Sequence, residues 1–266
     1  MAPSALDRAV IGLTSILPYN WLGNRLAILF RRIVTTPMER SGALDVERWG
    51  LKLRLHPRDN GCEKNLLFTP QMFEPEERVN LAGEIARVQG RPFVFIDIGA
   101  NVGLFSLFVA AHTGRNARIV AVEPEPGNFE RLNFTLASNP GLPITPIAAA
   151  LGESEGELAV VLNQRDRGGT KTQPVGQASN VVRVPCHPLL SLLREQGIEA
   201  VDALKIDVEG SEDKVLAPFF RDAPASLYPR FILIENGEWA TDLFALFAEK
   251  GYRVSARSKL NVMLRR

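Results

Sequence analysis

The most informative part of the sequence is Phe-Val-Phe-Ile-Asp-Ile-Gly-Ala-Asn-Val-Gly, residues 93–103. Its first four residues form a continuous apolar run, which is typical of a strand buried on both faces of a parallel sheet. Gly99 and Gly103 follow within a few positions, and an apolar helical pattern begins at Leu104. Glycine allows backbone conformations and a close ligand approach that a side chain prevents. The stretch therefore predicts a buried strand, a tight turn against a ligand, and a helix.

The same alternation of strand and helix continues to the end of the chain. Further apolar runs predict strands at residues 119–122, 144–150, 203–208 and 231–234. Helical patterns lie at residues 104–111, 128–137, 189–195, 212–220 and 242–249. This order is typical of the α/β class, with a doubly wound sheet and right-handed crossovers. Two final runs, 252–255 and 262–264, predict an antiparallel hairpin at the edge of the sheet.

The first ninety residues have a different character. The period-two pattern of residues 51–55 predicts a half-buried strand, and the acids that open residues 74–90 predict a helix. We therefore expect residues 1–90 to form a small N-terminal α+β cap and residues 91–266 to form the ligand-binding domain. Within that domain, the Gly- and Pro-containing segment 163–180 predicts a mobile excursion.

Composition narrows the class of protein and its compartment. Hydrophobic residues make up 45% of the 266 positions and charged residues 23%, which excludes a disordered chain. The formal net charge of +1 argues against nucleic acid as a partner. Cys62 and Cys186 match no metal or redox spacing and cannot form a disulfide framework. We therefore expect a reducing, cytoplasmic compartment.

The N-terminal residues predict an amphipathic helix. Between residues 21 and 34 apolar side chains recur at helical spacing, and residues 1–40 hold five arginines against two acids. No apolar run reaches the roughly 18 residues that a bilayer span requires. The simpler interpretation is a helix packed on the body of the protein. The alternative is peripheral contact of residues 9–34 with an anionic membrane surface.

The glycine turn and a following acid predict a nucleotide site. Glu123 follows Gly103 by 20 residues and closes the next strand, the place from which a carboxylate binds ribose hydroxyls. The turn reads G-x-x-x-G and lacks the G-x-G-x-x-G pattern of dinucleotide sites. Asp97, directly upstream, would repel a pyrophosphate but suits the ammonium group of an amino acid. These features favour S-adenosylmethionine over NAD as the cofactor.

Four segments resemble the successive motifs of the FkbM family of S-adenosylmethionine-dependent methyltransferases. They are Asp-Ile-Gly-Ala-Asn-Val-Gly at 97–103, Val-Glu-Pro-Glu-Pro at 122–126, Ala-Leu-Gly-Glu at 150–153 and Leu-Lys-Ile-Asp-Val-Glu-Gly-Ser-Glu at 204–212. The resemblance implies the class I methyltransferase fold, which is a Rossmann-like, seven-stranded doubly wound sheet with an antiparallel last strand. By the same resemblance, the cofactor site would comprise Asp97, Gly99, Ala100, Asn101 and Gly103 of the turn, Glu123 at the ribose, and Pro124 and Ala149 beside the adenine.

Acids near the ends of two later strands are candidates for proton transfer. Ligands of open α/β sheets bind at the carboxyl ends of the strands, where Asp207 and Glu235 each close a strand. Asp207, Glu209 and Glu235 are therefore candidates for the base that removes a proton from the acceptor. Lys205 has two possible roles, an ion pair with Asp207 or Glu235 and a part in catalysis, and the sequence does not choose between them. Asp207, Glu235 and Asn236 also offer oxygen ligands for a divalent metal, to which we do not commit.

The resemblance also implies an S-adenosylmethionine-dependent enzyme that methylates a hydroxyl of a sugar, a glycan or glycolipid, or another small natural product. A nucleic-acid or protein methyltransferase is the first alternative, but the chain lacks the Asp/Asn-Pro-Pro-Tyr/Phe run that aligns a base amine. A non-catalytic nucleotide-binding or membrane-associated module is the second alternative. The presence of Asp97, Glu123, Asp207 and Glu235 argues against it.

Overall fold

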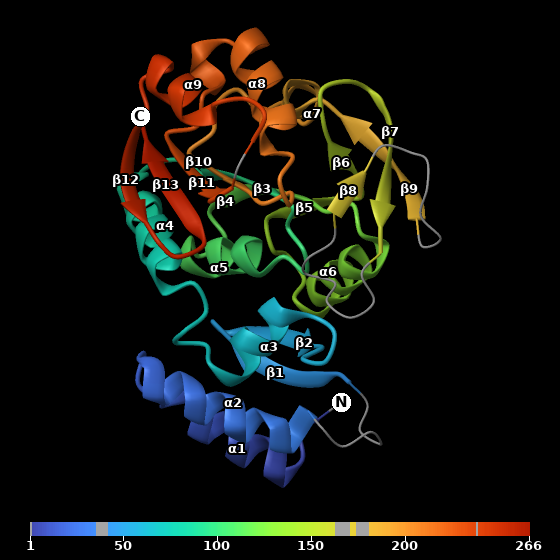
Figure 1. Ribbon diagram of the computed structural model, residues 1–266, viewed down its shortest axis with the longest axis vertical. Coiled ribbons are helices and arrows are strands. Elements are labelled where there is room, and N and C mark those ends of the chain that lie inside the picture. The colour runs from blue at the N-terminus through green and yellow to red at the C-terminus, as the bar shows by residue number, and fades with distance from the viewer. Residues whose placement is uncertain (1, 36–41, 163–170, 174–180, 238) are drawn as a thin grey trace.

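The computed structural model describes residues 2–35, 42–162, 171–173, 181–237 and 239–266. A seven-stranded sheet forms its centre, in the spatial order β12-β13-β11-β10-β3-β4-β5 (Figure 1). The strands are β3 (Phe93–Ile98), β4 (Ala117–Val122), β5 (Ile144–Ile147), β10 (Ala203–Ile206), β11 (Phe231–Glu235), β12 (Arg253–Arg257) and β13 (Asn261–Arg265). Strands β3, β4, β5, β10 and β11 pair in parallel, and β13 runs antiparallel to both β11 and β12. This confirms the predicted sheet and its C-terminal hairpin.

Helices cover both faces of this sheet (Figure 1). One side carries α4 (Pro75–Arg87), α5 (Leu104–His112) and α6 (Pro126–Ser138), and the other carries α7 (Leu189–Glu195), α8 (Glu212–Asp222), the single-turn η2 (Ala225–Leu227) and α9 (Leu243–Glu249). Side chains alternate along a strand, so each central strand contributes to two hydrophobic cores. In β3, Phe93 and Phe95 belong to the core that contains α5, whereas Ile96 and Ile98 belong to the core that contains α8. Burial on both faces explains why the strand reads as a continuous apolar run.

A second sheet of four short strands extends from the end of β5. It contains β6 (Ala150–Leu151), β7 (Gly156–Val161), β8 (Lys171–Gln173) and β9 (Val181–His187), in the order β6-β9-β7-β8. The prediction of one strand over residues 144–150 is wrong, because β5 ends at Ile147 and β6 pairs with β9 instead. The Ala149 amide donates to the Ile147 carbonyl (3.1 Å) in the turn between them, and small apolar residues carry no signal for such a break. Apart from β8, the predicted excursion at 163–180 lies outside the described residues.

The N-terminal part adds a pair of helices, a β-hairpin and a third helix (Figure 1). The elements are α1 (Ala5–Ser15), α2 (Trp21–Thr35), β1 (Leu44–Arg48), β2 (Leu51–Leu55) and α3 (Gly61–Phe68). The predicted α2 and β2 are confirmed, but the sequence patterns do not predict α1, β1 or α3. The start of α3 falls in a stretch that reads as a turn. There the Asn60 side chain accepts a hydrogen bond from the Glu63 amide (3.1 Å) and caps the helix.

A buried charge cluster joins α3 to α6. Arg131 of α6 donates from Nη1 to Glu63 Oε2 (2.7 Å) and from Nη2 to Asp59 Oδ2 (2.7 Å). Burial raises the pKa of Glu63 to about 7, although Arg131 lowers it. The hydrophobic core also continues from Leu66 of α3 into α5. The division into domains of residues 1–90 and 91–266 stays a prediction. One hydrophobic core contains residues from both parts.

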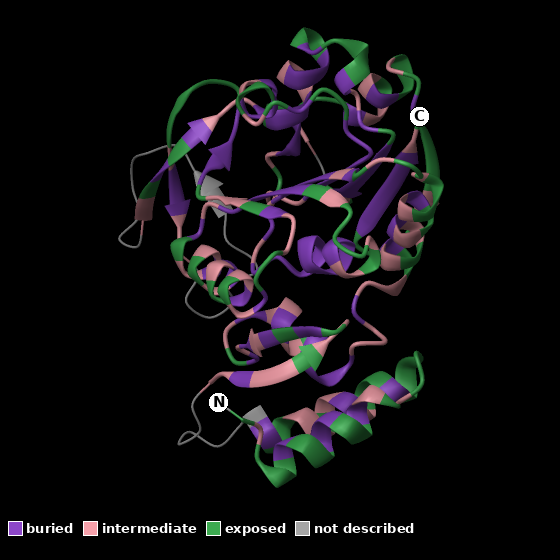
Figure 2. Ribbon diagram, turned by 180° about the vertical axis from the view of Figure 1, so that it is seen from behind, coloured by how far each residue is buried: buried purple, intermediate pink, exposed green. Residues whose placement is uncertain are grey.

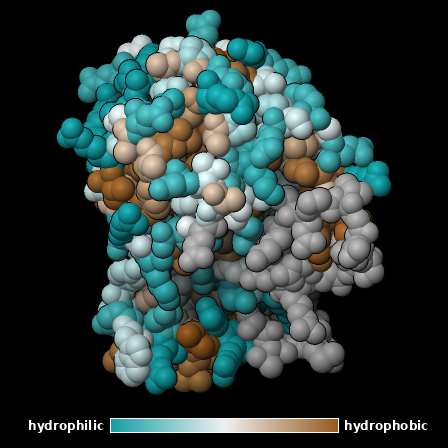
Figure 3. Space-filling view, turned by 45° about the horizontal axis from the view of Figure 1, so that its top comes forward, coloured by the Kyte–Doolittle hydropathy of each residue, from teal (hydrophilic) through white to brown (hydrophobic). Residues whose placement is uncertain are grey.

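Burial follows these layers. The central strands are buried, whereas α1 and α2 expose much of their surface at the far end of the molecule (Figure 2). On the face seen in Figure 3, hydrophilic residues cover most of the upper part and hydrophobic residues form separate groups. Among the described residues, no helix is both long enough and apolar enough to cross a membrane.

Candidate active site

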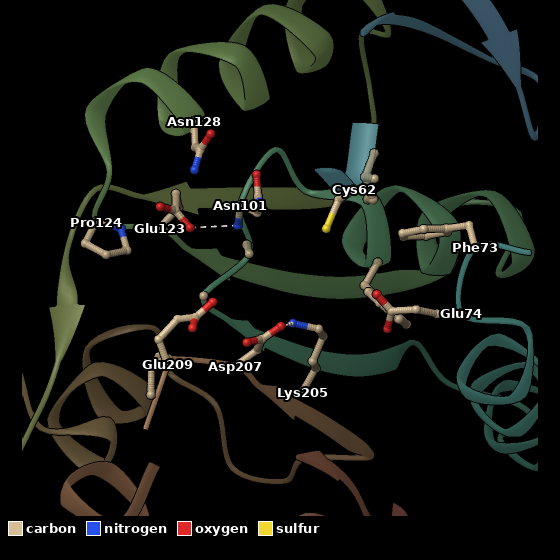
Figure 4. Close-up of a pocket in the computed structure, with 15 residues that line it drawn as sticks. Cys62, Phe73, Glu74, Asn101, Glu123, Pro124, Asn128, Lys205, Asp207 and Glu209 are labelled. Atoms are coloured by element: carbon tan, nitrogen blue, oxygen red, sulfur yellow. Dashed lines mark hydrogen bonds and ion pairs between the residues drawn. The ribbon is translucent and has the colours of Figure 1, made fainter. Parts of the chain in front are cut away.

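A cavity opens at the carboxyl ends of β3, β4 and β10 (Figure 4). The cavity is open to solvent on one side. The lining residues are Cys62, Phe73, Glu74, Gly99, Ala100, Asn101, Leu104, Phe105, Glu123, Pro124, Asn128, Lys205, Asp207, Val208 and Glu209. The cavity therefore unites five of the predicted cofactor residues with two of the predicted catalytic residues.

The glycine turn forms one wall of the cavity. Gly99 has a φ of +70°, and a Cβ at this position would lie 1.9 Å from the Asp207 carbonyl oxygen. The amides of Gly99 and Ala100 both donate to the Val122 carbonyl, each over 3.0 Å. Only glycine combines this backbone conformation with so close an approach. The turn is thus held between the ends of β4 and β10.

Glu123 at the end of β4 holds the turn from the other side. Its Oε2 accepts from the Asn101 amide (2.7 Å), and its Oε1 accepts from the Glu125 amide (2.8 Å). Burial raises the pKa of Glu123 to about 7, although these two hydrogen bonds lower it. A carboxylate has about four acceptor positions, so two remain for ligand hydroxyls. Glu123 can therefore hold the turn and a ribose together.

Three predicted cofactor residues, Asp97, Gly103 and Ala149, do not line the cavity. Asp97 is fully buried behind the turn, where its Oδ2 accepts from the amide and the hydroxyl of Ser106 (3.1 and 2.7 Å). Its Oδ1 has no hydrogen-bond partner among the described residues. Gly103 lies at the start of α5 against Leu132, and Ala149 is buried in the turn after β5. Direct contact of these three residues with the cofactor stays a prediction.

A lysine and a carboxylate lie together at the end of β10. Lys205 Nζ lies 3.2 Å from Asp207 Oδ2. Figure 4 marks this ion pair with a dashed line. Burial alone would lower the pKa of Lys205, but the charges of Asp207, Asp97 and Glu74 outweigh it and raise the pKa above its ordinary value. Lys205 is therefore a cation at neutral pH and cannot accept a proton. Of its two expected roles, the ion pair is present, and the ammonium group can also bind an anion.

The N-terminal part supplies a wall of the cavity that local sequence patterns do not predict. Its residues in the lining are Cys62, Phe73 and Glu74. The sequence patterns also give no sign that Leu104, Phe105, Asn128 and Val208 line a site. Glu74 has a left-handed backbone (φ 39°), and its Oε2 accepts from Asn261 Nδ2 (3.3 Å). Burial raises the pKa of Glu74 to about 7, although Lys205 lowers it. In the sequence this residue indicates only the start of a helix.

The two ends of the cavity differ in chemistry (Figure 4). One end holds Glu123 and Pro124, where a carboxylate can accept hydroxyl protons. The other end holds the cation Lys205 with the carboxylates of Glu74 and Asp207. A zwitterionic amino-acid group needs a cation for its carboxylate and an anion for its ammonium group. The residues present therefore fit a nucleoside joined to an amino acid.

Of the other predicted catalytic and metal-binding residues, only one lines the cavity. Glu209 lines the cavity, whereas Glu235 at the end of β11 does not. Burial and the charges of Asp207 and Glu209 raise the pKa of Glu235 to about 7. Asn236 is also outside the lining. In the described ranges no group of three or more His, Cys, Asp or Glu side chains is arranged for a metal ion. A metal site of Asp207, Glu235 and Asn236 stays an open alternative.

Comparisons with known proteins agree with this geometry. A family model described as the methyltransferase FkbM domain matches residues 97–254. Methyltransferase sdnD of Sordaria araneosa is 31% identical over 220 residues, which cover 63% of this chain and 84% of that protein. The METTL16 MTase domain matches with a TM-score of 0.52 at 12% identity, over 97% of this chain and 89% of that one, which supports the class I methyltransferase fold.

The crystal structure of methyltransferase FkbM from Methylobacillus flagellatus matches with a TM-score of 0.48 at 18% identity. That match covers 76% of this chain and 52% of the other, so this chain spans about half the length of that protein. The FkbM domain model alone matches more than half of this chain, and it includes the glycine turn, Glu123 and Asp207. The chain belongs to the FkbM family of S-adenosylmethionine-dependent methyltransferases.

Proposed function

We propose that the protein transfers the methyl group of S-adenosylmethionine to a hydroxyl of a sugar, a glycan or glycolipid, or another small natural product. The observation that carries this proposal is the carboxylate of Asp207 in the same cavity as the glycine turn. When bound, the cofactor supplies a methyl group on a positively charged sulfur. The protein must then add alignment, which can contribute about 7–11 kcal/mol, and a base for the hydroxyl proton.

The cofactor would be held at both ends of the cavity. Glu123 would accept hydrogen bonds from the ribose hydroxyls, and Pro124 would border the adenine. Lys205 would bind the carboxylate of the methionine, and Glu74 would bind its ammonium group. In this arrangement the carboxylate and the ammonium group of the methionine each meet an opposite charge. This supports the proposed orientation of the cofactor in the cavity.

Asp207 would serve as the base. Lys205 contacts its Oδ2, which leaves Oδ1 to accept the proton of the acceptor. The Asp207 side chain is 39% exposed, so an acceptor can reach it from the cavity. Glu209 lines the same cavity and is the other candidate. Its negative charge also disfavours a phosphate backbone, which argues against a nucleic-acid acceptor.

Transfer of a radiolabelled methyl group into fractions of a cell extract tests this function. We expect label in small or glycan-containing fractions, in a form that survives mild alkali as a methyl ether does. Treatment with nuclease and with protease should leave that label in place. Label that nuclease or protease releases would contradict the proposal, and cofactor binding without any transfer would favour a non-catalytic module.

Replacing Glu123 with glutamine is expected to weaken cofactor binding by about 1–3 kcal/mol, because hydrogen bonds to a charged carboxylate are lost. The pH profile should change as well. Since the pKa of Glu123 is raised to about 7, the ionised form that accepts hydroxyls grows as the pH rises through 7. Wild-type affinity should therefore rise between about pH 6 and 8, and the variant should lose part of this rise.

Calorimetric titration of the cofactor at several pH values measures both effects. The pKa of Glu74 is also about 7, so Glu74 adds its own pH dependence to cofactor affinity in both proteins. The contribution of Glu123 is therefore the difference between the affinity profiles of the wild type and Glu123→Gln. Equal dissociation constants and equal pH profiles would show that Glu123 does not bind the ribose.

A further inference from the structure

The pair of helices α1 and α2 carries most of the exposed hydrophobic surface. Among the described residues, eight of the twelve large hydrophobic side chains that are exposed lie between residues 6 and 33. Two rows account for most of them. The α1 row is Leu6, Leu13 and Ile16, and the α2 row is Leu22, Leu29 and Ile33. We call the two rows together the N-terminal apolar surface.

These rows are separate from the faces that hold the helices to the protein. In α1, Val10 and Ile11 are buried on the face that packs inward, and in α2, Ala27 and Val34 are buried. Residues spaced by three or four positions share one side of a helix. The spacing therefore places each exposed row on a different side from the buried residues of its own helix. Each helix therefore has buried apolar residues on one side and exposed apolar residues on another. Figure 2 shows buried and exposed residues on both helices.

The charges beside this surface have one sign. Arg8, Arg25 and Arg32 are exposed on the same two helices. Asp7 is the single acid between residues 2 and 34, and it is buried at the start of α1, where it accepts from the Ser4 amide (2.8 Å). The chain as a whole has a net charge of only +1. Residues 2–34 thus carry four arginines against one buried acid, which gives the two helices a net positive charge.

Exposed aromatic rings lie at the connection between the helices. Tyr19 and Trp21 are 65% and 69% exposed, and the Arg25 guanidinium lies 4.7 Å from the centre of the Trp21 ring. Tyr and Trp are typical of membrane interfaces, because each ring combines an apolar body with a polar group. An apolar row flanked by arginines and aromatic rings is the pattern of a helix that lies in the plane of a bilayer surface.

We propose that α1 and α2 dock on the surface of an anionic lipid bilayer through the N-terminal apolar surface. The leucine and isoleucine side chains enter the boundary between headgroups and acyl chains, and the arginines contact anionic headgroups. A second copy of the chain is a poorer occupant, because two such surfaces would bring like charges together. This proposal does not depend on the acceptor that the enzyme methylates.

The end of α1 is hydrogen-bonded to the segment that precedes one wall of the active-site cavity. Gln71 Nε2 donates to the carbonyls of Thr14 and Leu17 at the end of α1, both over 2.9 Å. Phe73 and Glu74, two and three residues further along the chain, line the cavity. A bilayer that binds α1 would therefore contact a helix that is hydrogen-bonded to the segment leading to Phe73 and Glu74 in the cavity wall.

Vesicle flotation of the full chain tests the proposal. The probes are vesicles of phosphatidylcholine alone and of phosphatidylcholine mixed with phosphatidylglycerol. We expect the wild type to float with the mixed vesicles and to bind the neutral ones much more weakly. Leu22→Ser/Leu29→Ser should reduce partitioning on mixed vesicles by at least about tenfold. Arg25→Gln/Arg32→Gln should reduce it by about fivefold for each arginine, with little change on neutral vesicles.

A matched control removes as much exposed apolar surface elsewhere. Leu22 and Leu29 are 56% and 59% exposed, and Val79 and Leu260 are 72% and 56% exposed on other elements. Val79→Ser/Leu260→Ser should float as the wild type does. Unchanged thermal unfolding of every variant shows that each one is folded. Failure of the wild type to float with either vesicle would overturn the proposal, and so would a concentration-dependent dimer that Leu22→Ser/Leu29→Ser converts to a monomer without any vesicle binding.

Discussion

Asp207→Asn is expected to lower the rate of methyl transfer by about 10²–10⁴-fold, the usual contribution of a general base. Asparagine keeps the size of the side chain but cannot take the proton of the acceptor hydroxyl. The stability of the protein should fall much less than the rate, because Asp97 and Glu74 still oppose the charge of Lys205. Initial rates with the acceptor found by methyl transfer, together with thermal unfolding, measure the two quantities.

The neighbouring acids provide the controls for Asp207. Glu235 closes the next strand but does not line the cavity, so Glu235→Gln should change the rate by less than about tenfold. Glu209→Gln distinguishes Asp207 from Glu209, the two candidate bases that line the cavity. If Glu209→Gln lost the rate and Asp207→Asn kept it, the base would be Glu209. If Asp207→Asn raised only the dissociation constant of the cofactor, Asp207 would bind the ammonium group instead.

Gly99→Ala is expected to disrupt both the cofactor turn and the position of Asp207. A Cβ would lie 1.9 Å from the Asp207 carbonyl oxygen, so one of the two segments must move. The left-handed conformation, with a φ of +70°, adds roughly 1–2 kcal/mol for a residue with a side chain. We expect a total loss of stability of on the order of 3 kcal/mol, together with loss of cofactor binding.

Gly90 offers a matched control for this substitution. Its φ is +75°, almost the same as that of Gly99, but no atom lies within 4 Å of a Cβ built there. Gly90→Ala should therefore show only the conformational cost of roughly 1–2 kcal/mol and should bind the cofactor normally. Denaturant unfolding and calorimetric titration of both variants separate the two contributions. Equal stability losses and normal cofactor binding in both would show that the contact between the turn and β10 is not needed.

Local patterns in the sequence account for most of the sheet and for one end of the site. Period-two and continuous apolar runs depend on neighbouring residues, and so does a glycine turn between a strand and a helix. For this reason β3, Gly99 and Glu123 could be placed before the structure was known. The same local signals missed the break after Ile147, because the residues there are apolar on both sides of the turn.

Sequence patterns alone predict an α/β sheet with a glycine turn after β3 and a carboxylate at the end of β10. The surroundings of that carboxylate depend on how distant segments pack. Glu74 is separated from Asp207 by more than one hundred residues, and it reaches the cavity because the N-terminal part packs on the sheet. The charges of Asp97, Asp207 and Glu74 around Lys205 outweigh its burial and keep it a cation. Asp97 and Glu74 come from distant segments, so the residues next to Lys205 in the sequence do not predict them.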